Sequence, residues 1–369
     1  MLLYLAVAIW PLIIQRLYAH GRLVIGNRRV EFETHLIIAM TPIFVLLAFR
    51  SGKMGNDTAT YVRQFGEMID IPLEYAFATS RMEQGYLVFV KALTFITHNG
   101  LVYQVICVTI MMMGMYFFLI EHEKDAFLFL YFYCTLGLFF FMFTGTRQCL
   151  AMTICLFSYR FAQRKQYIRF LLCVVLAYYF HKSAVLFVIV PLVMLIKVNL
   201  ITTIIYIIVP FILGRYLQAI QTWFNDTLDY SYGIESTGSG MIFLMVIIVF
   251  TVFSMIQLFN SGYIGKNNTV MSGLGKETQD FTQEVYNLLN INFITLAFWA
   301  MRLQTRVAER PSYYFLFFSC LLFAKAFNRI TENQNRQLYW FLMIGFTLAL
   351  YVYRLSTNFA SFVPYQFYS

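Results

Sequence analysis

The sequence predicts an all-α integral membrane protein: one polytopic domain over residues 1–369 with about twelve transmembrane helices, within a range of about 11–14. Hydrophobic residues make up 60% of the chain and charged residues only 12%, whereas a soluble domain carries roughly 25% charge. The mean hydropathy is +0.66. Aromatic residues account for 19% of the chain, a proportion that suits lipid-facing surfaces and interfacial belts.

A membrane-crossing helix needs about 20 mostly apolar residues. The run at 85–98 is shorter than this and has Lys91 in its middle, so we expect a re-entrant or interfacial helix there. If it crosses instead, the topology of everything before it inverts. Several other runs are also short and need tilt or burial within the protein. The predicted crossings are 1–18, 34–50, 101–120, 126–143, 148–162, 168–181, 183–197, 200–214, 240–259, 286–301, 312–326 and 337–354.

Twelve crossings place both termini on the outer face of the membrane and the basic run Gln163–Arg169 on the inner face. The excess of Lys and Arg on the inner face is in the expected direction but weak. Residues 51–84 and 215–239 are then outer-face, periplasmic loops, and the polar, Gly-rich segment 260–285 is a cytoplasmic connector. The net charge of +9 favours contact with anionic lipid or phosphate over nucleic acid, because the chain lies in a membrane. The first 18 residues lack a basic start and a cleavage site, so we expect a retained helix.

Several classes of chemistry lack their sequence signatures. The six cysteines lie in apolar runs without a CxxC pair, which favours small buried side chains over disulfides or metal ligands. P-loop, GxGxxG, HExxH and GxSxG motifs are absent, and so is a DxD pair of the kind that holds a nucleotide-sugar metal. This pattern argues against ATP-driven transport and against a nucleotide-sugar transferase.

Two residues at the ends of apolar runs are costly to place in lipid, and such residues are candidates for a functional role. Arg147 follows Thr144-Gly145-Thr146 and precedes an apolar helix, so its guanidinium could bind phosphate beside a helix N-terminus. A snorkelling interfacial arginine is the alternative. His181 ends the aromatic run 178–180 at a tight turn, where it could be the general base for a sugar hydroxyl. The alternative for His181 is a turn histidine bonded to backbone.

Polar groups in the first outer loop are further candidates. Asp57 could orient or deprotonate a hydroxyl, or it could be the N-cap of a helix over residues 58–68. Glu83 and Tyr86 could contact the glycan, or they could form a cap or hinge before the run at 85–98.

Two other groups point to anionic and sugar ligands. Arg302, Arg306 and Arg310 recur every four residues, which on one continuous helix would place them on one face as a phosphate clamp or a lipid-headgroup anchor. In the loop at 215–239, aromatic rings stand beside carboxylates, as sugar faces and hydroxyls require; an amphipathic interfacial loop is the alternative. The glycan candidates there are Trp223, Asp226 and Tyr230.

A set of short motifs resembles the EpsG-like, Wzy-type polymerases of bacterial surface polysaccharides, the O-antigens of lipopolysaccharide and exopolysaccharides. Each motif is weak alone, but their order and spacing extend across nearly the whole chain. The motifs are Gly55-x-Asp57-Thr58-x-x-Tyr61, Glu83-x-Gly85-Tyr86, Thr146-Arg147-Gln148-x-x-Ala151, Phe180-His181-x-Ser183-Ala184 and Phe362-Val363-Pro364-Tyr365.

The resemblance implies a GT-C-like polytopic glycosyltransferase of the bacterial inner membrane, with its active site facing the periplasm or outside. Such an enzyme transfers a growing glycan from undecaprenyl diphosphate to the non-reducing end of a new undecaprenyl-diphosphate-linked repeat unit. The expected partners are this lipid-linked oligosaccharide, membrane lipid and a chain-length-regulating co-polymerase. On this basis Arg147 and the three C-terminal arginines would bind the diphosphate, with His181 or Asp57 as the base. Because arginines can neutralise the leaving group, we expect neither metal nor cofactor.

Two alternatives remain open from the sequence. An O-antigen ligase performs the same transfer, but onto lipid A-core. A lipid-linked oligosaccharide flippase or other transporter would show two related halves and charges at mid-membrane, whereas here the charges gather at the ends of the apolar runs.

Overall fold

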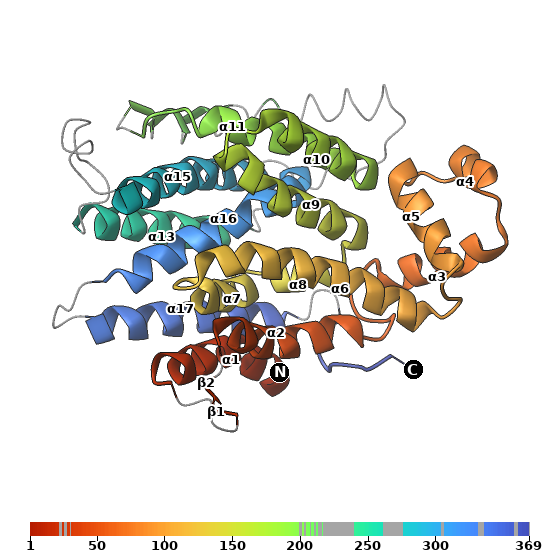
Figure 1. The fold of residues 1–369 in the computed structure, drawn as a ribbon, viewed down its shortest axis with the longest axis horizontal. Coiled ribbons are helices and arrows are strands. Elements are labelled where there is room, and N and C mark those ends of the chain that lie inside the picture. The colour runs from red at the N-terminus through yellow and green to blue at the C-terminus, as the bar shows by residue number, and fades with distance from the viewer. Residues whose placement is uncertain are drawn as a thin grey trace. The chain divides into compact units, whose positions relative to one another are not determined.

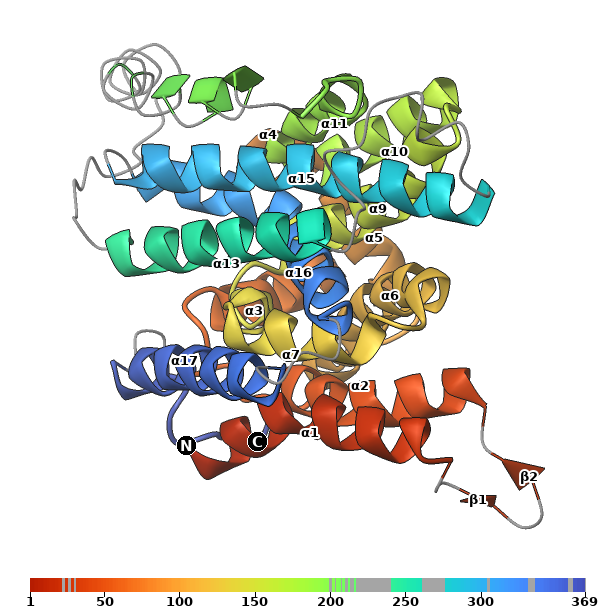
Figure 2. The same cartoon turned by 90° about the vertical axis from the view of Figure 1, so that its left-hand side faces the viewer.

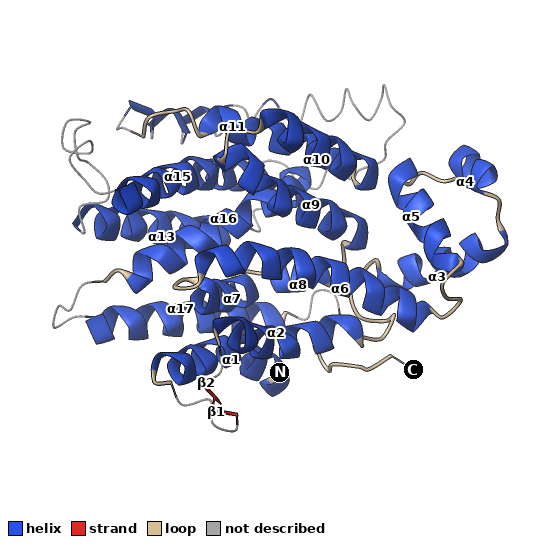
Figure 3. Cartoon of the chain, viewed as in Figure 1, coloured by secondary structure: helices blue, strands red, loops and turns tan. Residues whose placement is uncertain are grey.

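The computed structural model describes residues 1–21, 24–25, 28–29, 31–198, 240–260, 276–303, 306–330, 336–357 and 361–368, with isolated positions between 201 and 216. Within these residues the helices are joined by loops, and the strands are one short antiparallel pair, β1 (Val24–Ile25) with β2 (Arg28–Arg29) (Figure 3). The all-α class is therefore confirmed. The chain forms two compact units, one of residues 1–187 and 338–369 and the other of residues 188–337.

The first unit contains most of the helices (Figure 1). They are α1 (Leu2–Ala19), α2 (Phe32–Ala48), α3 (Thr58–Asp70), α4 (Leu73–Thr79), α5 (Gln84–Thr94), α6 (Gly100–Leu119), η1 (Ile120–His122), α7 (Ala126–Thr135), α8 (Leu138–Met142), α9 (Thr146–Gln163), α10 (Tyr167–Phe180), η2 (Lys182–Val188), which ends at the boundary, and nearly all of α17 (Arg336–Ser356).

The second unit contains α11 (Ile189–Val193), α13 (Met241–Asn260), α15 (Lys276–Arg302), η3 (Arg306–Ala308) and α16 (Glu309–Asn328). Helices α13, α15 and α16 pack along one another (Figure 2). Buried hydroxyl and amide groups join them: the Asn292 Nδ2 donates to Thr251 Oγ1 (2.8 Å), and Ser319 Oγ donates to Thr295 Oγ1 (3.0 Å). Such bonds hold apolar helices together where water is excluded.

Four described helical segments are long and apolar enough to cross a membrane: residues Leu2–Ala19, Gly100–His122, Met241–Asn260 and Gln337–Ser356. Their length and composition are those of an α-helical membrane protein. The apolar helices at Phe32–Ala48, Ala126–Thr135, Tyr167–Phe180 and Lys182–Val193 are shorter. The count of about twelve crossings stays a prediction, and the run at 200–214 lies only in part within the described residues.

Three predicted boundaries differ in the structure. The run at 126–143 is two helices, because Gly137 between α7 and α8 is left-handed at φ 99° and the Leu136 carbonyl is bound by the Arg354 guanidinium instead (3.3 Å). The run at 183–197 begins as a 3₁₀ helix and becomes α11 near Pro191, which lies in that helix's first turn. The connector predicted at 260–285 is helical from Lys276 onward.

Helices α7 and α8 form the core of the first unit. Every residue of both is buried, so this aromatic run faces protein and not lipid. Helix α7 packs against α1 and α2, and the Tyr131 hydroxyl is 2.6 Å from Thr347 Oγ1 on α17. The ring of Tyr4 on α1 packs against Phe140 and Phe143. These contacts fix the segment that leads directly into α9.

Helices α3, α4 and α5 form a small group that packs on α6 and α10 (orange in Figure 1). Lys91, in the middle of the apolar run at 85–98, has a structural role here. Its ammonium group donates to three carbonyl oxygens at the end of α3, those of Met68 (2.8 Å), Ile69 (3.2 Å) and Ile71 (2.9 Å). Because the last carbonyls of a helix lack partners within it, the lysine satisfies them and ties α5 to α3.

Replacing Lys91 with methionine should therefore loosen the α3–α5 group. A hydrogen bond from a charged donor contributes about 1.5–3 kcal/mol, and three bonds from one ammonium group do not add in full, so we expect a loss of at least about 2 kcal/mol in folding free energy. The measurements are the thermal midpoint of the purified protein and its rate of proteolytic cleavage within residues 58–94. Arg63→Met on α3 is the control, because Arg63 is exposed and, within the described residues, pairs with Glu67 on its own helix. Equal midpoints for both variants would contradict the role of Lys91.

Candidate functional site

The guanidinium of Arg147 lies in the first turn of α9, where the sequence placed it. Its Nη1 pairs with Glu83 Oε2, and its Nε donates to the Tyr61 hydroxyl (3.5 Å). Its Cζ is 5.9 Å from the ring centroids of both Tyr61 and Tyr86, within range of a cation–π contact. The Arg147 side chain is 21% exposed, so it can be reached from outside the fold. The site is thus an accessible cation beside a helix N-terminus, framed by two phenol rings.

Glu83 connects Arg147 to the turn that carries His181. While one carboxylate oxygen pairs with Arg147, the other accepts the backbone N–H of Lys182 (3.1 Å). His181 is the C-cap residue that directly follows α10, and its Nδ1 is 2.7 Å from Ser183 Oγ. The structure therefore brings together three motifs that are far apart in the sequence. Glu83 stands at the N-cap position of α5 but makes no capping side-chain bond, so its carboxylate serves these tertiary contacts.

Gly85 allows α5 to approach the end of α10 closely enough for the Glu83 contacts. A Cβ atom at this position would lie 2.6 Å from Tyr179 Cβ and 2.8 Å from the Tyr179 carbonyl oxygen. Such distances require the backbone to move. The hydroxyl of the next residue, Tyr86, is 2.6 Å from that of Tyr103 on α6, and burial raises the pKa of Tyr86 well above its ordinary value. This hydroxyl stays neutral and anchors α5 from the other side.

Gly85→Ala should therefore separate α5 from α10 and pull Glu83 away from both of its partners. For the polysaccharide polymerase that the motif resemblance implies, we expect polymer production to fall at least tenfold, because a displacement of about 1 Å in a positioned site can cost about a hundredfold in rate. Chain-length analysis of surface polysaccharide in a strain carrying the variant measures this. Gly66→Ala is the matched control, since a Cβ on that helical glycine meets nothing within 4 Å and should be neutral or slightly stabilising. Similar polymer from the two variants would contradict this packing.

The Gly55–Tyr61 motif is held against the segment that precedes Arg147. Thr58 Oγ1 donates to the Phe143 carbonyl (2.6 Å), and Gly55, at φ 80°, is so close that a Cβ would lie 2.4 Å from the same carbonyl oxygen. Asp57 occupies the N-cap position of α3, as one sequence alternative expected, but makes no capping side-chain bond. Helix α3 begins at Thr58 and ends at Asp70, which confirms the helix expected at 58–68. The motif thus sets Tyr61 beside Arg147.

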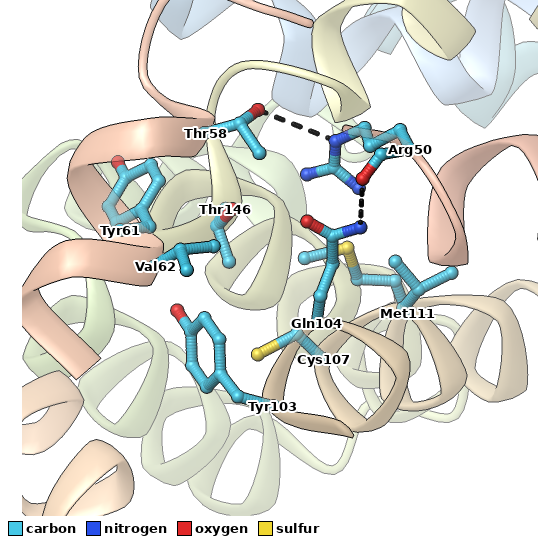
Figure 4. Close-up of a pocket in the computed structure, with 10 residues that line it drawn as sticks. Arg50, Thr58, Tyr61, Val62, Tyr103, Gln104, Cys107, Met111 and Thr146 are labelled. Atoms are coloured by element: carbon cyan, nitrogen blue, oxygen red, sulfur yellow. Dashed lines mark hydrogen bonds between the residues drawn. The ribbon is translucent and has the colours of Figure 1, made fainter. Parts of the chain in front are cut away.

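Arg50 is a buried cation in this region that sequence reasoning did not single out. Only 2% of it is exposed, and its Nε donates to Thr58 Oγ1 (3.4 Å). It borders a cavity of about 10 Å³ with Tyr61, Tyr103, Gln104 and other residues (Figure 4). Its guanidinium remains a cation at neutral pH, because arginine side chains are not deprotonated in proteins. Its position at the end of an apolar run is the same signal that identified Arg147.

The backbone around Arg50 is fixed from two directions. The Gln104 side-chain amide donates to the carbonyls of Ala48 (2.8 Å) and Arg50 (2.9 Å). From the C-terminal segment, the Gln366 carbonyl accepts the Ser51 N–H (2.8 Å), and Arg50 forms an antiparallel bridge with Phe367. The Phe362–Tyr365 motif anchors this segment: the Tyr4 hydroxyl donates to the Phe362 carbonyl (2.7 Å) and the Tyr365 hydroxyl to the Leu46 carbonyl (3.0 Å).

The row of three arginines predicted after residue 301 is not one helical face. Helix α15 ends at Arg302, Arg306 lies in η3, and Arg310 lies in the first turn of α16. Pro311 lies in the first turn of α16, which begins at Glu309, and its missing N–H costs no helical hydrogen bond at that position. Arg302 is buried and its Nε pairs with Glu309 (2.7 Å), whose other oxygen accepts the Tyr313 hydroxyl (3.0 Å). Arg310 is exposed.

Two groups of predicted site residues are not part of the Arg147 site as described. Arg302, Arg306 and Arg310 belong to the second unit. Trp223, Asp226 and Tyr230, the glycan candidates of the loop at 215–239, lie outside the described residues. In the described part of the chain, no three His, Cys, Asp or Glu side chains gather into a potential metal site. Metal independence stays a prediction.

Comparison with known proteins bears directly on the motifs that build this site. The family model of the EpsG family matches residues 33–367, a range that contains all five motifs. Neither the curated proteins nor the solved structures provide a match. The family indicates a glycosyltransferase-like polymerase with a general role in polysaccharide biosynthesis, in agreement with the apolar helices of a membrane protein. Because the match covers nearly the whole chain, the chain belongs to the EpsG family.

Proposed function

We propose that this protein polymerises oligosaccharide repeat units carried on undecaprenyl diphosphate. It transfers the growing glycan from one lipid diphosphate to the non-reducing end of a new lipid-linked unit. The observation that carries the proposal is the accessible guanidinium of Arg147, framed by Tyr61 and Tyr86 and connected through Glu83 to the turn of His181. A glycosyl transfer of this kind needs a cation for the departing diphosphate and a base for the incoming hydroxyl.

The proposed reaction is a single, inverting displacement. The acceptor hydroxyl loses its proton to the base, either His181 or Asp57. Its oxygen forms a bond to the anomeric carbon of the donor sugar, and the bond from that carbon to the phosphate oxygen breaks. The electron pair leaves with undecaprenyl diphosphate, whose developing charge Arg147 stabilises together with the N-terminus of α9.

The other predicted residues keep their proposed roles with some adjustment. Arg306 and Arg310 are proposed as further cations for the diphosphate, whereas Arg302 would first have to exchange its partner Glu309. Trp223, Asp226 and Tyr230 are proposed glycan contacts. Tyr86 no longer fits that role, because it is buried and its hydroxyl is 2.6 Å from that of Tyr103. Because arginines can neutralise the leaving group, we propose that the reaction needs no metal, and unchanged polymerisation in EDTA is the expected result.

We further propose that the protein lies in the bacterial inner membrane with the site facing the periplasm. Cysteine labelling within residues 51–84 tests this orientation. Labelling by a membrane-impermeant reagent from the periplasmic side is expected, and labelling from the cytoplasmic side only would contradict it. A co-polymerase that sets chain length is a proposed partner, together with membrane lipid.

Deletion of the gene tests the function in cells. A polymerase mutant should leave single repeat units attached to the lipid A-core, or no extended exopolysaccharide, and complementation should restore long chains. Two other outcomes would contradict the proposal. Polymer that accumulates on undecaprenyl diphosphate would indicate a ligase, and single lipid-linked units that accumulate on the cytoplasmic face would indicate a flippase.

A further inference from the structure

We infer that Glu83 is a positioning residue for Arg147, and that in the unliganded protein its carboxylate holds the place on Arg147 that a phosphate group of the lipid-linked substrate takes. The inference rests on the proposed function and replaces one of the two roles that the sequence left open for Glu83, a contact with the glycan. It makes the Arg147–Glu83 pair an exchangeable one: substrate binding replaces a carboxylate with a phosphate on the same guanidinium.

The two carboxylate oxygens of Glu83 have different partners, which is the first support for this role. Oε1 accepts the Lys182 N–H at 3.1 Å, a contact with backbone that does not depend on any side chain of the turn. Oε2 pairs with Arg147 Nη1. The main chain of Glu83 is held independently, because its carbonyl accepts the Leu87 N–H (3.1 Å) at the start of α5 and Gly85 packs on Tyr179. The residue can therefore release Arg147 without losing its place in the fold.

The chemistry of the pair is the second support. A guanidinium binds carboxylate and phosphate through the same N–H donors, so the two anions compete for it. Arg147 is 21% exposed and Glu83 only 10%, so the accessible member of the pair is the one that an incoming anion would bind. Tyr61 and Tyr86, which flank the guanidinium, can keep it in place during the exchange.

This arrangement predicts that the carboxylate weakens anion binding while it supports turnover. A competing carboxylate lowers the affinity of Arg147 for diphosphate. After transfer, the same carboxylate can return to Arg147 and help to release undecaprenyl diphosphate. Without it, the enzyme should bind diphosphate more tightly and turn over more slowly, so that KM and kcat fall together. A glycan contact predicts the opposite for KM, and a purely structural residue predicts lower stability with no gain in anion affinity.

Glu83→Gln is the direct test, because glutamine can still accept the Lys182 N–H but has no charge to place on Arg147. With the purified full-length protein and inorganic pyrophosphate as the probe, we expect calorimetry to show affinity about tenfold higher than for the unchanged protein. Polymerisation assays with lipid-linked repeats should show lower kcat and lower KM. Glu67→Gln on α3 is the control, since Glu67 is exposed and pairs only with Arg63; it should change neither quantity.

Glu83→Asp is a second variant in case the glutamine substitution prevents folding. Its carboxylate is one methylene shorter, so it should shift pyrophosphate affinity in the same direction by a smaller factor. Pyrophosphate affinity that is unchanged or lower in these variants would overturn the inference. Arg147→Ala separates this failure from failure of the proposed function: inactive Arg147→Ala with no gain in Glu83→Gln rejects the inference alone, whereas active Arg147→Ala rejects the role of Arg147 and both proposals with it.

Discussion

Replacing Arg147 with alanine is expected to abolish polymer while the protein remains in the membrane. The proposed leaving group is a diphosphate, and its charge develops where this guanidinium lies. Removing one preorganised donor from such a site typically costs about 100–1,000-fold in rate. Because the guanidinium also pairs with Glu83, the variant leaves that partly buried carboxylate without its cation and should slightly lower the thermal midpoint as well.

Arg147→Lys and Arg160→Ala sharpen this test. Lysine keeps the charge but cannot form the forked contact, so we expect partial activity. Arg160 lies near the other end of the same helix, where its Cζ is 4.2 Å from the Phe157 ring centroid, and its loss should leave polymer unchanged. Gel analysis of surface polysaccharide measures the polymer, and immunoblots of membrane fractions measure the amount of protein in the membrane. Long chains from an Arg147→Ala strain would remove this residue from the mechanism.

Removing residues 362–369 is expected to have the second largest effect, because the C-terminal segment packs on the core of the first unit and bonds to the backbone beside Arg50. Phe362 packs with the rings of Phe140 (4.9 Å) and Phe143 (5.3 Å) in the core of the first unit. The same truncation removes the backbone bonds to Phe49 and Ser51, on either side of Arg50. Loss of a buried phenylalanine alone costs about 3–5 kcal/mol. We therefore expect a much lower thermal midpoint and no polymer.

Point variants separate the parts of this effect. Phe362→Ala should reproduce most of the loss in stability. Tyr365→Phe removes only the bond to the Leu46 carbonyl, a change of about 1 kcal/mol. Phe367→Ala is the control, because that side chain is 62% exposed and only its backbone takes part in the bridge to Arg50. Wild-type stability and polymer in the truncated protein would show that the C-terminal segment does not hold the site.

The family motifs could be found in the sequence, but their geometry could not. Arg147 and His181 stood out because charged and titratable groups at the ends of apolar runs are costly. The Glu83 carboxylate that joins their surroundings could not be predicted, because its partners lie 64 and 99 residues away. Arg50 carried the same signal as Arg147 but is not itself part of any of the five motifs; the nearest one begins at Gly55. Its position depends on backbone pairing with Phe367, which lies near the other end of the sequence.

Regular spacing was the least reliable guide. The four-residue repeat of Arg302, Arg306 and Arg310 predicts one face only if a single helix runs through all three, and the helix ends at Arg302. A continuous apolar run is a second pattern that did not predict the helix boundaries: residues 126–143 form two helices, which are separated at the left-handed Gly137. Lys91 shows the reverse case. A charge in the middle of an apolar run argued against a membrane crossing there, and in the structure it joins α5 to the end of α3.

Polymerisation by the purified protein alone tests the central proposal most directly. Lipid-linked repeat units would be supplied in detergent or liposomes, without any other protein and in the presence of EDTA, and the products separated by chain length. The proposal predicts a ladder of products with two or more repeats, joined to one undecaprenyl diphosphate and accompanied by release of the other. It predicts no ladder from Arg147→Ala. Folded, wild-type protein that returns only single repeat units, or that moves them across the bilayer without forming a glycosidic bond, would contradict it.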